Sequence, residues 1–404
     1  MSFVTHLEST FDGTRLPART LQHLHGGKPL LVRYDLERIG RSVTQEALRT
    51  REPSLWRYAE LLPLEHAAHR VSLGERITPL LECPRLAAQV GLDSLWIKDE
   101  SILPTGSFKA RGMAMAVSLA HELGVTKVAI PSAGNAGGAL AAYAARAGME
   151  CFVFLPADTP LVNRLEAPLY GARTFLVNGL IGDCAKIVRE GVERLGWFDF
   201  STLKEPYRIE GKKTMGLELC EQLEWTLPDA IFYPTGGGTG LIGMWKAFAE
   251  LEAIGWLPPG RRPRMYACQA EGCAPLPRAF AAGHTESPPI DDPRTIAAGL
   301  RVPTALGDFL VLRAVRESGG KALAAREADI PLWMHAATRL EGIALCPEAA
   351  TCLATLAAEV QAGSLARDAR VVVFNTGAAQ KYVEAIACEL PSLDHRAIDW
   401  TVIR

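Results

Sequence analysis

The sequence predicts an α/β protein in which helices cover parallel sheets. From Leu80 onward, short β-branched runs alternate with alanine-rich stretches, which is the pattern of strands followed by helices. Glycine-rich turns stand between a strand-like run and a helix-like run at residues 131–138 and again at 234–240. The chain has 404 residues, of which 48% are hydrophobic and 22% charged, so it is long enough for two or three globular domains.

Each element follows from its local pattern. Residues 95–100 (LWIKDE) predict a strand, and residues 113–124 predict a helix that ends at a glycine. The remaining segments repeat this order: strand, turn and helix at 127–148, strands at 151–156 and 174–179, strand, glycine loop and helix at 229–251, and buried strands at 264–270 and 370–377. Ligands of such sheets bind at the carboxyl ends of the strands, where the glycine-rich turns fall here.

Composition and charge exclude several classes of function. The formal net charge is −2 and no dense basic run is present, so a nucleic-acid binder is not expected. No apolar stretch reaches the ~18–20 residues that span a bilayer, and the start MSFVTHLEST lacks the pattern of a secretory signal. Nine cysteines without a CxxC pair favour buried thiols in a reducing cytoplasm over a disulfide framework. We therefore expect a cytoplasmic enzyme or binding protein.

Two of four candidate segments carry a polar side chain suited to chemistry at a carbonyl or a ring. In PTGSFKARG (104–112), the Lys109 amine can form a Schiff base with a carbonyl cofactor and then act as an acid or base, although a solvated surface lysine has the same local pattern. In PSAGNAGG (131–138), free backbone N–H groups at a helix start and the Asn135 amide can bind an anion or a ring oxygen. The same turn also serves as a helix entry without a ligand.

The other two segments suit a phosphate and a ring nitrogen. In PTGGGTG (234–240), three glycines and Thr239 let backbone amides approach a phosphate, and the lysine of a Walker loop is absent. The G-x-G-x-x-G spacing at 238–243 also allows a dinucleotide, but no clear acidic ribose partner follows about 20 residues later. In FNTGAAQKY (374–382), Thr376 can hydrogen-bond a ring nitrogen or cap the turn.

The order and spacing of these segments resemble the fold-type II pyridoxal-phosphate enzymes, and most closely their threonine synthase branch. The resemblance runs from Trp56 to Tyr382 and includes WRYAELLPL, VSLGERITPL, PTGSFKARGM, SAGNAGGALAAYAARAG, YRIEGKKTMGLEL, PTGGGTGLIGMWKAF, AAGLRVP, EGIALCPEAA and FNTG. It implies that Lys109 holds pyridoxal 5'-phosphate as a Schiff base and shuttles protons. It further implies these cofactor contacts: Asn135 at the phenolic oxygen, Gly236, Gly237, Gly238 and Thr239 at the phosphate, and Thr376 at the pyridine nitrogen.

The resemblance also implies a substrate and a set of residues that bind it. The expected reaction converts O-phospho-L-homoserine and water into L-threonine and phosphate. The expected contacts with the small amino-acid substrate are Ser107, Ser132, Ala133, Gly134, Glu205 and Arg208, and Asn163 and Arg164 are further candidates. The alternatives are a threonine or serine dehydratase or another β-elimination or β-replacement enzyme, a catalytically silent binding homologue, and a nicotinamide dehydrogenase. A homodimer without nucleic-acid or membrane partners is expected.

Three features depart from the pattern of this branch. Many members begin with a CxxC…CxxC zinc ribbon, whereas this chain offers only His6, His23 and His25 there, so we expect a ribbon-like extension without a metal. Ala110 stands where threonine synthases usually carry an aspartate. Glu205 stands where several have an asparagine.

The change at Glu205 bears directly on the substrate. A carboxylate ~4 Å from a phosphate charge costs about 1 kcal/mol in water and about 4 kcal/mol at an effective dielectric constant near 20. Nearby Arg208, Lys212 and Lys213 can offset this cost, or Glu205 can point elsewhere and pair with Arg208. The substitution therefore keeps the dehydratase alternative open.

The resemblance further implies two α/β domains with the cofactor in the cleft between them. We expect a large cofactor-binding domain from residues 80–112 and 209–404, and a small α/β domain from residues 113–208. Residues 1–79 are expected to pack against these domains as the extension.

Overall fold

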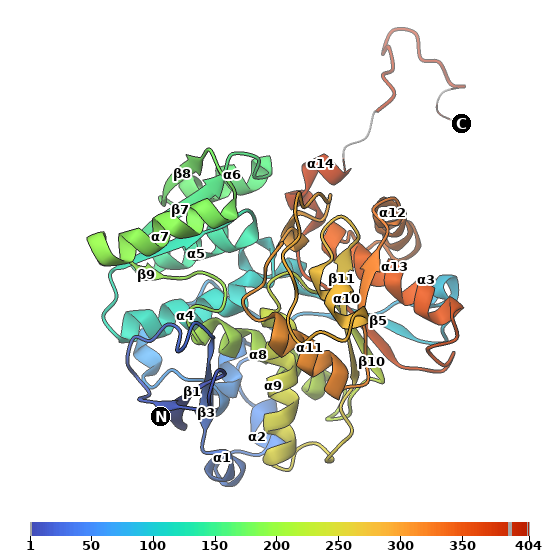
Figure 1. The fold of residues 1–404 in the computed structure, drawn as a ribbon. Helices are drawn as coiled ribbons and strands as arrows, with labels where there is room; N and C mark the ends of the chain where they lie inside the picture. Colours follow the sequence, from blue (N-terminus) through green and yellow to red (C-terminus); the bar gives the residue numbers. More distant parts are fainter. Residues whose placement is uncertain (1, 387–389, 402, 404) are drawn as a thin grey trace.

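The larger of two central sheets has six strands in the order β12-β11-β10-β13-β5-β4. Three of them, β5, β10 and β11, are labelled in Figure 1. The protein is described here by a computed structural model that covers residues 2–386, 390–401 and 403. All neighbouring strands of the sheet are parallel except β4, which runs antiparallel to β5. The strands are β4 (Leu80–Glu82), β5 (Leu95–Asp99), β10 (Ala230–Pro234), β11 (Arg264–Ala270), β12 (Ala322–Ala325) and β13 (Val371–Asn375).

Helices cover both faces of this sheet because alternate side chains of its strands point to opposite sides. Ile231, Tyr233 and Phe374 belong to the main core, and Phe232 and Val373 belong to a second core on the other face. The main core includes α8 (Tyr207–Gln222), α9 (Thr239–Ala253), α10 (Pro275–Ala281) and α11 (Asp308–Glu317). The second core includes α3 (Pro84–Val90), α12 (Asp329–Glu341) and α13 (Pro347–Gln361).

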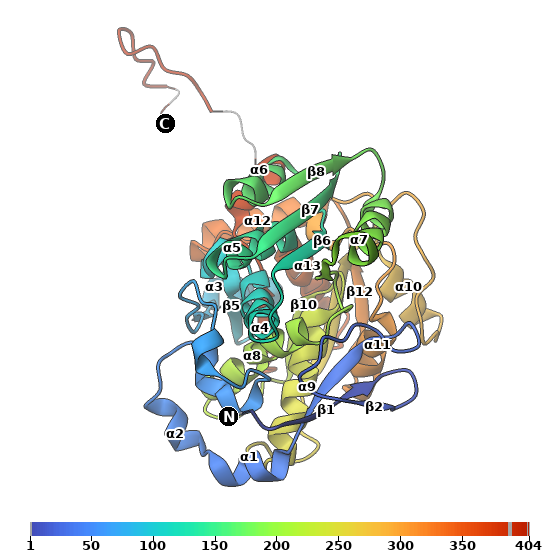
Figure 2. The same cartoon turned by 90° about the vertical axis from the view of Figure 1, so that its left-hand side faces the viewer.

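The smaller sheet has four parallel strands in the order β8-β7-β6-β9. Figure 2 shows β8, β7 and β6 side by side in this order. Its strands are β6 (Lys127–Pro131), β7 (Glu150–Pro156), β8 (Arg173–Val177) and β9 (Phe198–Asp199). Its helices are α5 (Asn135–Arg146), α6 (Leu161–Leu169) and α7 (Ile181–Leu195). Aromatic side chains of β7 stack beneath α7, where the ring centres of Phe152 and Trp197 lie 4.6 Å apart.

Two helices join the sheets and lie against each other. The chain leaves the larger sheet through α4 (Lys109–Glu122) and returns to it through α8. Their backbones touch at two glycines: a Cβ at Gly211 would collide with the carbonyl oxygen of Arg111, and one at Gly112 would lie 3.2 Å from the carbonyl oxygen of Arg208. Glycine permits this approach because it has no side chain.

The N-terminal extension forms a three-stranded antiparallel sheet of β1 (Val4–Ser9), β2 (Arg15–Leu16) and β3 (Leu30–Tyr34). Two short helices follow, α1 (Leu36–Ser42) and α2 (Gln45–Arg49). The Tyr34 hydroxyl donates a 2.7 Å hydrogen bond to Glu210 of α8. Glu210 is also paired with Lys213 and Lys246, both buried, so the extension is attached to a buried charged cluster.

The three N-terminal histidines lie in separate settings. His6 is hydrogen-bonded to Thr5, His25 lies 3.3 Å from the Asp12 carboxylate, and His23 stacks on Phe198. Within residues 2–386, 390–401 and 403, no three His, Cys, Asp or Glu side chains are grouped so that they could hold a metal ion. In the same residues, no helix is long and apolar enough to cross a membrane.

The α/β fold expected from the sequence is confirmed, with local differences in several elements. The sequence did not indicate β12, because its ALAA segment lacks β-branched residues, or β4, whose three residues are too few to show a period. The helix expected to start at Met113 begins four residues earlier, so Lys109 is its first residue. α14 (Val383–Ile386) is the last helix of the described chain. The proposed domain limits at residues 79, 112 and 208 stay predictions.

Candidate active site

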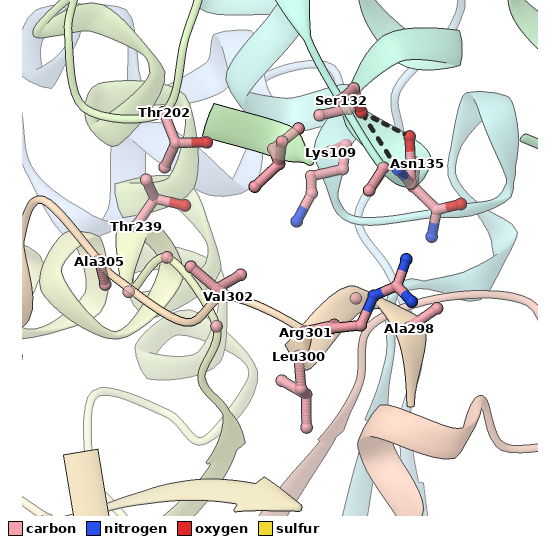
Figure 3. Close-up of a pocket in the computed structure, with 18 of the residues that line it drawn as sticks. Lys109, Ser132, Asn135, Thr202, Thr239, Ala298, Leu300, Arg301, Val302 and Ala305 are labelled. Atoms are coloured by element: carbon pink, nitrogen blue, oxygen red, sulfur yellow. Dashed lines mark hydrogen bonds between the residues drawn. The ribbon is translucent and has the colours of Figure 1, made fainter. Parts of the chain in front are cut away.

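A cavity of about 640 Å³ lies where the loops after several strands meet, between the two sheets (Figure 3). The turn after β6 contributes Ser132 to Asn135, the loop after β10 contributes Gly236 to Gly238, and Thr376 follows β13. Carboxyl ends of parallel strands form a shared edge, so residues far apart in sequence converge there. The cavity therefore brings together segments from all four candidate motifs.

Lys109 projects its amine into this cavity from the first position of α4. Its Nζ lies 4.0 Å from the centre of the Phe108 ring. Burial and the positive charge of Arg208 together lower the pKa of Lys109 to about 7, although the Glu348 carboxyl and the Cys346 thiol oppose the shift. A large fraction of this amine is therefore uncharged and nucleophilic at neutral pH.

The glycine loop after β10 forms an anion-binding cradle. The backbone N–H groups of Gly236, Gly237 and Gly238 donate to no other group in the described part of the chain. Gly238 has φ +82° and a Cβ there would lie 2.5 Å from Val311, while a Cβ at Gly236 would lie 2.7 Å from the carbonyl oxygen of Gly299. Thr239 starts the 15-residue helix α9, whose dipole favours negative charge at this end.

Asn135 and Thr376 line the same cavity from opposite sheets. The Nδ2 of Asn135 donates a 3.0 Å hydrogen bond to the Tyr382 hydroxyl, and its Oδ1 accepts one of 3.0 Å from Asn163. The Thr376 hydroxyl lies 3.7 Å from the Cys346 sulfur and is otherwise available to a ligand. Both side chains therefore offer a polar atom to the cavity.

The turn that begins with Ser132 is organised by its own side chain. The Ser132 hydroxyl accepts hydrogen bonds from the backbone N–H groups of Gly134 and Gly137, at 3.3 and 3.0 Å. Ala133 and Gly134 also line the cavity. Ser107 is buried beside it, and its hydroxyl has no partner among the described residues, but Ser107 does not belong to the cavity wall.

The structure places Arg208 in the cavity wall and Glu205 behind it. The Arg208 Nη1 donates a 2.7 Å hydrogen bond to the carbonyl of Phe200. The Glu205 Oε2 accepts hydrogen bonds from the backbone N–H groups of Tyr207 (2.8 Å) and Arg208 (3.1 Å), and its Oε1 lies 3.9 Å from the Arg208 Nε. Burial raises the pKa of Glu205 to about 8, although Arg208 and the backbone N–H groups of Tyr207 and Arg208 act in the opposite direction. Glu205 thus contacts the start of α8 and not the cavity.

Several polar residues of the cavity wall were not assigned from the sequence, among them Thr202, Arg301, Glu348 and Tyr382. Arg301, Glu348 and Tyr382 lie in the motifs AAGLRVP, EGIALCPEAA and FNTGAAQKY, respectively. The sequence therefore pointed to these segments without showing which of their side chains faces the cavity. Arg301 Nη1 lies 2.9 Å from the Asp158 carboxylate, which joins the two halves of the molecule at the cavity rim. Of the two further candidates, Asn163 reaches the site only through Asn135, and Arg164 lines a neighbouring cavity.

Comparison with known proteins identifies relatives over most of the chain. Residues 71–377 match a family model described as pyridoxal-phosphate dependent enzyme. The chain is 36% identical to the threonine synthase of Methanocaldococcus jannaschii, over 87% of this chain and 86% of that one. It is also 36% identical to the threonine synthase of Methanosarcina acetivorans, over 91% of this chain and 89% of the relative.

A solved structure shares the fold at lower sequence identity. Maize serine racemase aligns with a TM-score of 0.66 and 24% identity, over 77% of this chain and 90% of that one. At this identity the likeness concerns the fold alone.

Proposed function

Since the chain belongs to the pyridoxal-phosphate dependent enzymes, and within them to the threonine synthase family, we propose that it converts O-phospho-L-homoserine and water into L-threonine and phosphate. The observation that carries the proposal is the cavity itself, which combines a lysine whose pKa is lowered to about 7 with two separate anion-binding features, the glycine loop and Arg208. The cofactor phosphate and the substrate phosphate each require one anion-binding feature.

The residues of the cavity fit pyridoxal 5'-phosphate. The free N–H groups of Gly236 to Gly238 and the start of α9 suit its phosphate, and the loop keeps this conformation because side chains at these glycines would collide with Gly299, Thr202 and Val311. Lys109 suits its aldehyde, Asn135 its phenolic oxygen and Thr376 its ring nitrogen. The cofactor supplies an electron sink, and the protein decides which bond breaks.

The residues of this chain bind the substrate and move its protons. Lys109 takes a proton from the substrate Cα and returns protons at neighbouring carbons, because an amine with a pKa near 7 both accepts and donates at neutral pH. Arg208 binds the substrate phosphate. In the turn from Ser132 to Gly134, the backbone N–H of Ala133, which has no acceptor among the described residues, donates to the substrate carboxylate. The uncharged Thr376 hydroxyl leaves the ring nitrogen without a charged partner, which limits delocalisation of negative charge into the ring.

A dehydratase is the second candidate, and the environment of Arg208 favours it. The guanidinium already contacts the Phe200 carbonyl and lies near Glu205, so part of its capacity for a substrate phosphate is in use. A substrate without a phosphate, such as threonine or serine, does not require Arg208 to bind a phosphate.

The remaining features of the proposal concern assembly and location. We place the enzyme in the cytoplasm as a homodimer. A reducing compartment agrees with eight cysteines in the described residues that are all free and buried. The large domain holds the cofactor phosphate and the small domain closes the cavity with the Ser132 turn.

Turnover of O-phospho-L-homoserine by the cofactor-loaded protein tests the proposal, with phosphate and threonine measured together. We expect equal amounts of both. A Lys109→Ala variant is expected to lose turnover and the visible absorbance of the bound cofactor together. Release of a 2-oxo acid from threonine or serine, without reaction of O-phospho-L-homoserine, would replace the proposal with the dehydratase.

A further inference from the structure

Three of the four candidate segments meet at one buried ion pair that the mechanism does not use. Lys381 belongs to the motif FNTGAAQKY, and its amine lies 2.7 Å from each carboxylate oxygen of Glu166 on α6. The same amine donates a 2.8 Å hydrogen bond to the backbone carbonyl of Thr105 in the motif PTGSFKARG. The two side chains are 9% and 11% exposed, and neither lines the cavity. The pair therefore joins a helix of the smaller sheet to the turn that precedes Lys109.

Two glycines from separate motifs make room for this pair. A Cβ at Gly138, the last residue of PSAGNAGG, would collide with the carboxylate of Glu166. A Cβ at Gly106, which follows Thr105, would lie 3.2 Å from the Cδ of Lys381. A side chain at Gly138 would displace the glutamate and one at Gly106 would crowd the lysine, so both motifs are adapted to the ion pair.

The turn that Lys381 contacts has a strained backbone. Thr105 has φ +60° and ψ 18°, in the left-handed region that a β-branched residue rarely adopts. Its hydroxyl oxygen is buried without a hydrogen-bond partner in the described part of the chain, so its own side chain does not compensate for the strain. A hydrogen bond from a charged amine to the carbonyl stabilises the turn by about as much as such a conformation costs.

The residues after the turn are held by hydrogen bonds to a distant segment. The Gly106 carbonyl accepts a 2.8 Å hydrogen bond from the Ala378 N–H, and the Phe108 N–H donates a 3.0 Å hydrogen bond to the Thr376 carbonyl. Because these bonds tie the start of α4 to the segment after β13, a different conformation at Thr105 would have to break one of them or move the first residue of α4.

We propose that Lys381 is a positioning residue that stabilises the strained conformation of Thr105 and thereby fixes Lys109 in place for reaction with the aldehyde of the cofactor. Glu166 holds the Lys381 amine against the Thr105 carbonyl. The inference rests on the proposed function, because it takes Lys109 as the residue that binds pyridoxal 5'-phosphate. The position of Lys109 then depends on both halves of the molecule.

A rescue experiment separates this role from a general loss of stability. Lys381→Met keeps the apolar stem of the side chain and removes its donors. Thr105→Gly removes the need for Lys381, since glycine adopts a positive φ without steric cost. The rate at which each full-length apoprotein takes up pyridoxal 5'-phosphate is measured at constant pH from the absorbance of the bound cofactor.

We expect Lys381→Met to lower the rate constant of uptake about tenfold, as the loss of one charge-assisted hydrogen bond does. The double variant Thr105→Gly/Lys381→Met should take up the cofactor nearly as fast as Thr105→Gly alone. The double variant Thr105→Ala/Lys381→Met is the matched comparison, because it loses the same hydroxyl and methyl groups but keeps a side chain at positive φ. It should recover less of the rate.

Further variants keep folding effects apart. Lys321→Met breaks an ion pair with Glu359 beside the start of β12 and should leave the rate unchanged. Where Lys381→Met does not fold, Glu166→Gln takes its place, and Thr105→Gly should again restore the rate.

A wild-type rate in Lys381→Met, or a loss that Thr105→Gly does not repair, would overturn the inference and leave the proposed function intact. A wild-type protein that acquires no visible cofactor band would instead overturn the proposed function and, with it, the role of Lys381.

Discussion

Replacing Glu218 by glutamine tests how a buried charged network holds the lysine-bearing helix in place. Glu218 of α8 pairs with Lys98 of β5 at 3.0 Å and with Arg111 of α4 at 2.5 Å, and Arg111 also binds Glu100. All four side chains are at most 1% exposed. Two cations thus face two anions, and Arg111 lies two residues beyond Lys109.

Glu218→Gln leaves one positive charge without a counter-charge in this interior. Breaking a buried pair by removing one partner costs about 3–5 kcal/mol, because the remaining charge stays desolvated. We therefore expect the free energy of unfolding to fall by that amount, measured by urea unfolding followed by tryptophan fluorescence. The double variant Glu218→Gln/Lys98→Met restores the balance of charge, so it should recover part of the loss.

The control is Glu190→Gln, which changes an exposed pair with Arg194 on α7. Exposed pairs of this kind contribute roughly 0–1 kcal/mol, so little change is expected. A loss below about 1 kcal/mol in Glu218→Gln, or a double variant that is less stable than the single one, would show that the network does not act through its charges.

Three further outcomes are expected. The rate at which the apoprotein takes up pyridoxal 5'-phosphate should rise with pH and level off above about 7, because only the uncharged Lys109 amine reacts and its pKa is lowered to about 7; a flat profile from pH 5 to 9 would contradict this. Gly240→Ala should weaken cofactor binding at least tenfold in a fluorescence titration, since its Cβ would collide with the Tyr233 hydroxyl beneath the glycine loop; unchanged affinity would refute that reasoning. Tyr34→Phe should cost about 1–3 kcal/mol by leaving Glu210 with one donor fewer, and limited proteolysis should then cut the N-terminal extension sooner than in the wild type.

The sequence indicated those segments of the candidate site whose conformation is set by residues close to them in the chain. The glycine loop at 236–238 and the turn at Asn135 are strand-to-helix junctions, and such junctions are visible as glycine clusters beside apolar runs. The parallel sheets followed from the same alternation. In contrast, β1 to β3 escaped prediction because VTHLES and LLVRY do not alternate apolar and polar residues regularly and β2 has only two residues.

The parts that escaped prediction depend on contacts between distant residues. Tyr382 is 247 residues from Asn135, and only the folded chain shows that the two side chains meet. Glu205 could be placed near Arg208 from spacing alone, but its direction follows from the backbone N–H groups at the start of α8, which compete for its carboxylate. Sequence spacing does not resolve such competition.

The backbone contact between α4 and α8 has a consequence for movement within the molecule. Each connection between the sheets contains one of the two glycines, Gly112 in α4 and Gly211 in α8. Gly112 lies within one helical turn of Lys109, and Gly211 within one helical turn of Arg208. A rotation of one sheet against the other would have its pivot there, and displacement grows with distance from a pivot. Lys109 and Arg208 lie beside this pivot and would therefore move least, so a rotation of the sheets would keep the amine and the guanidinium close to their positions relative to each other.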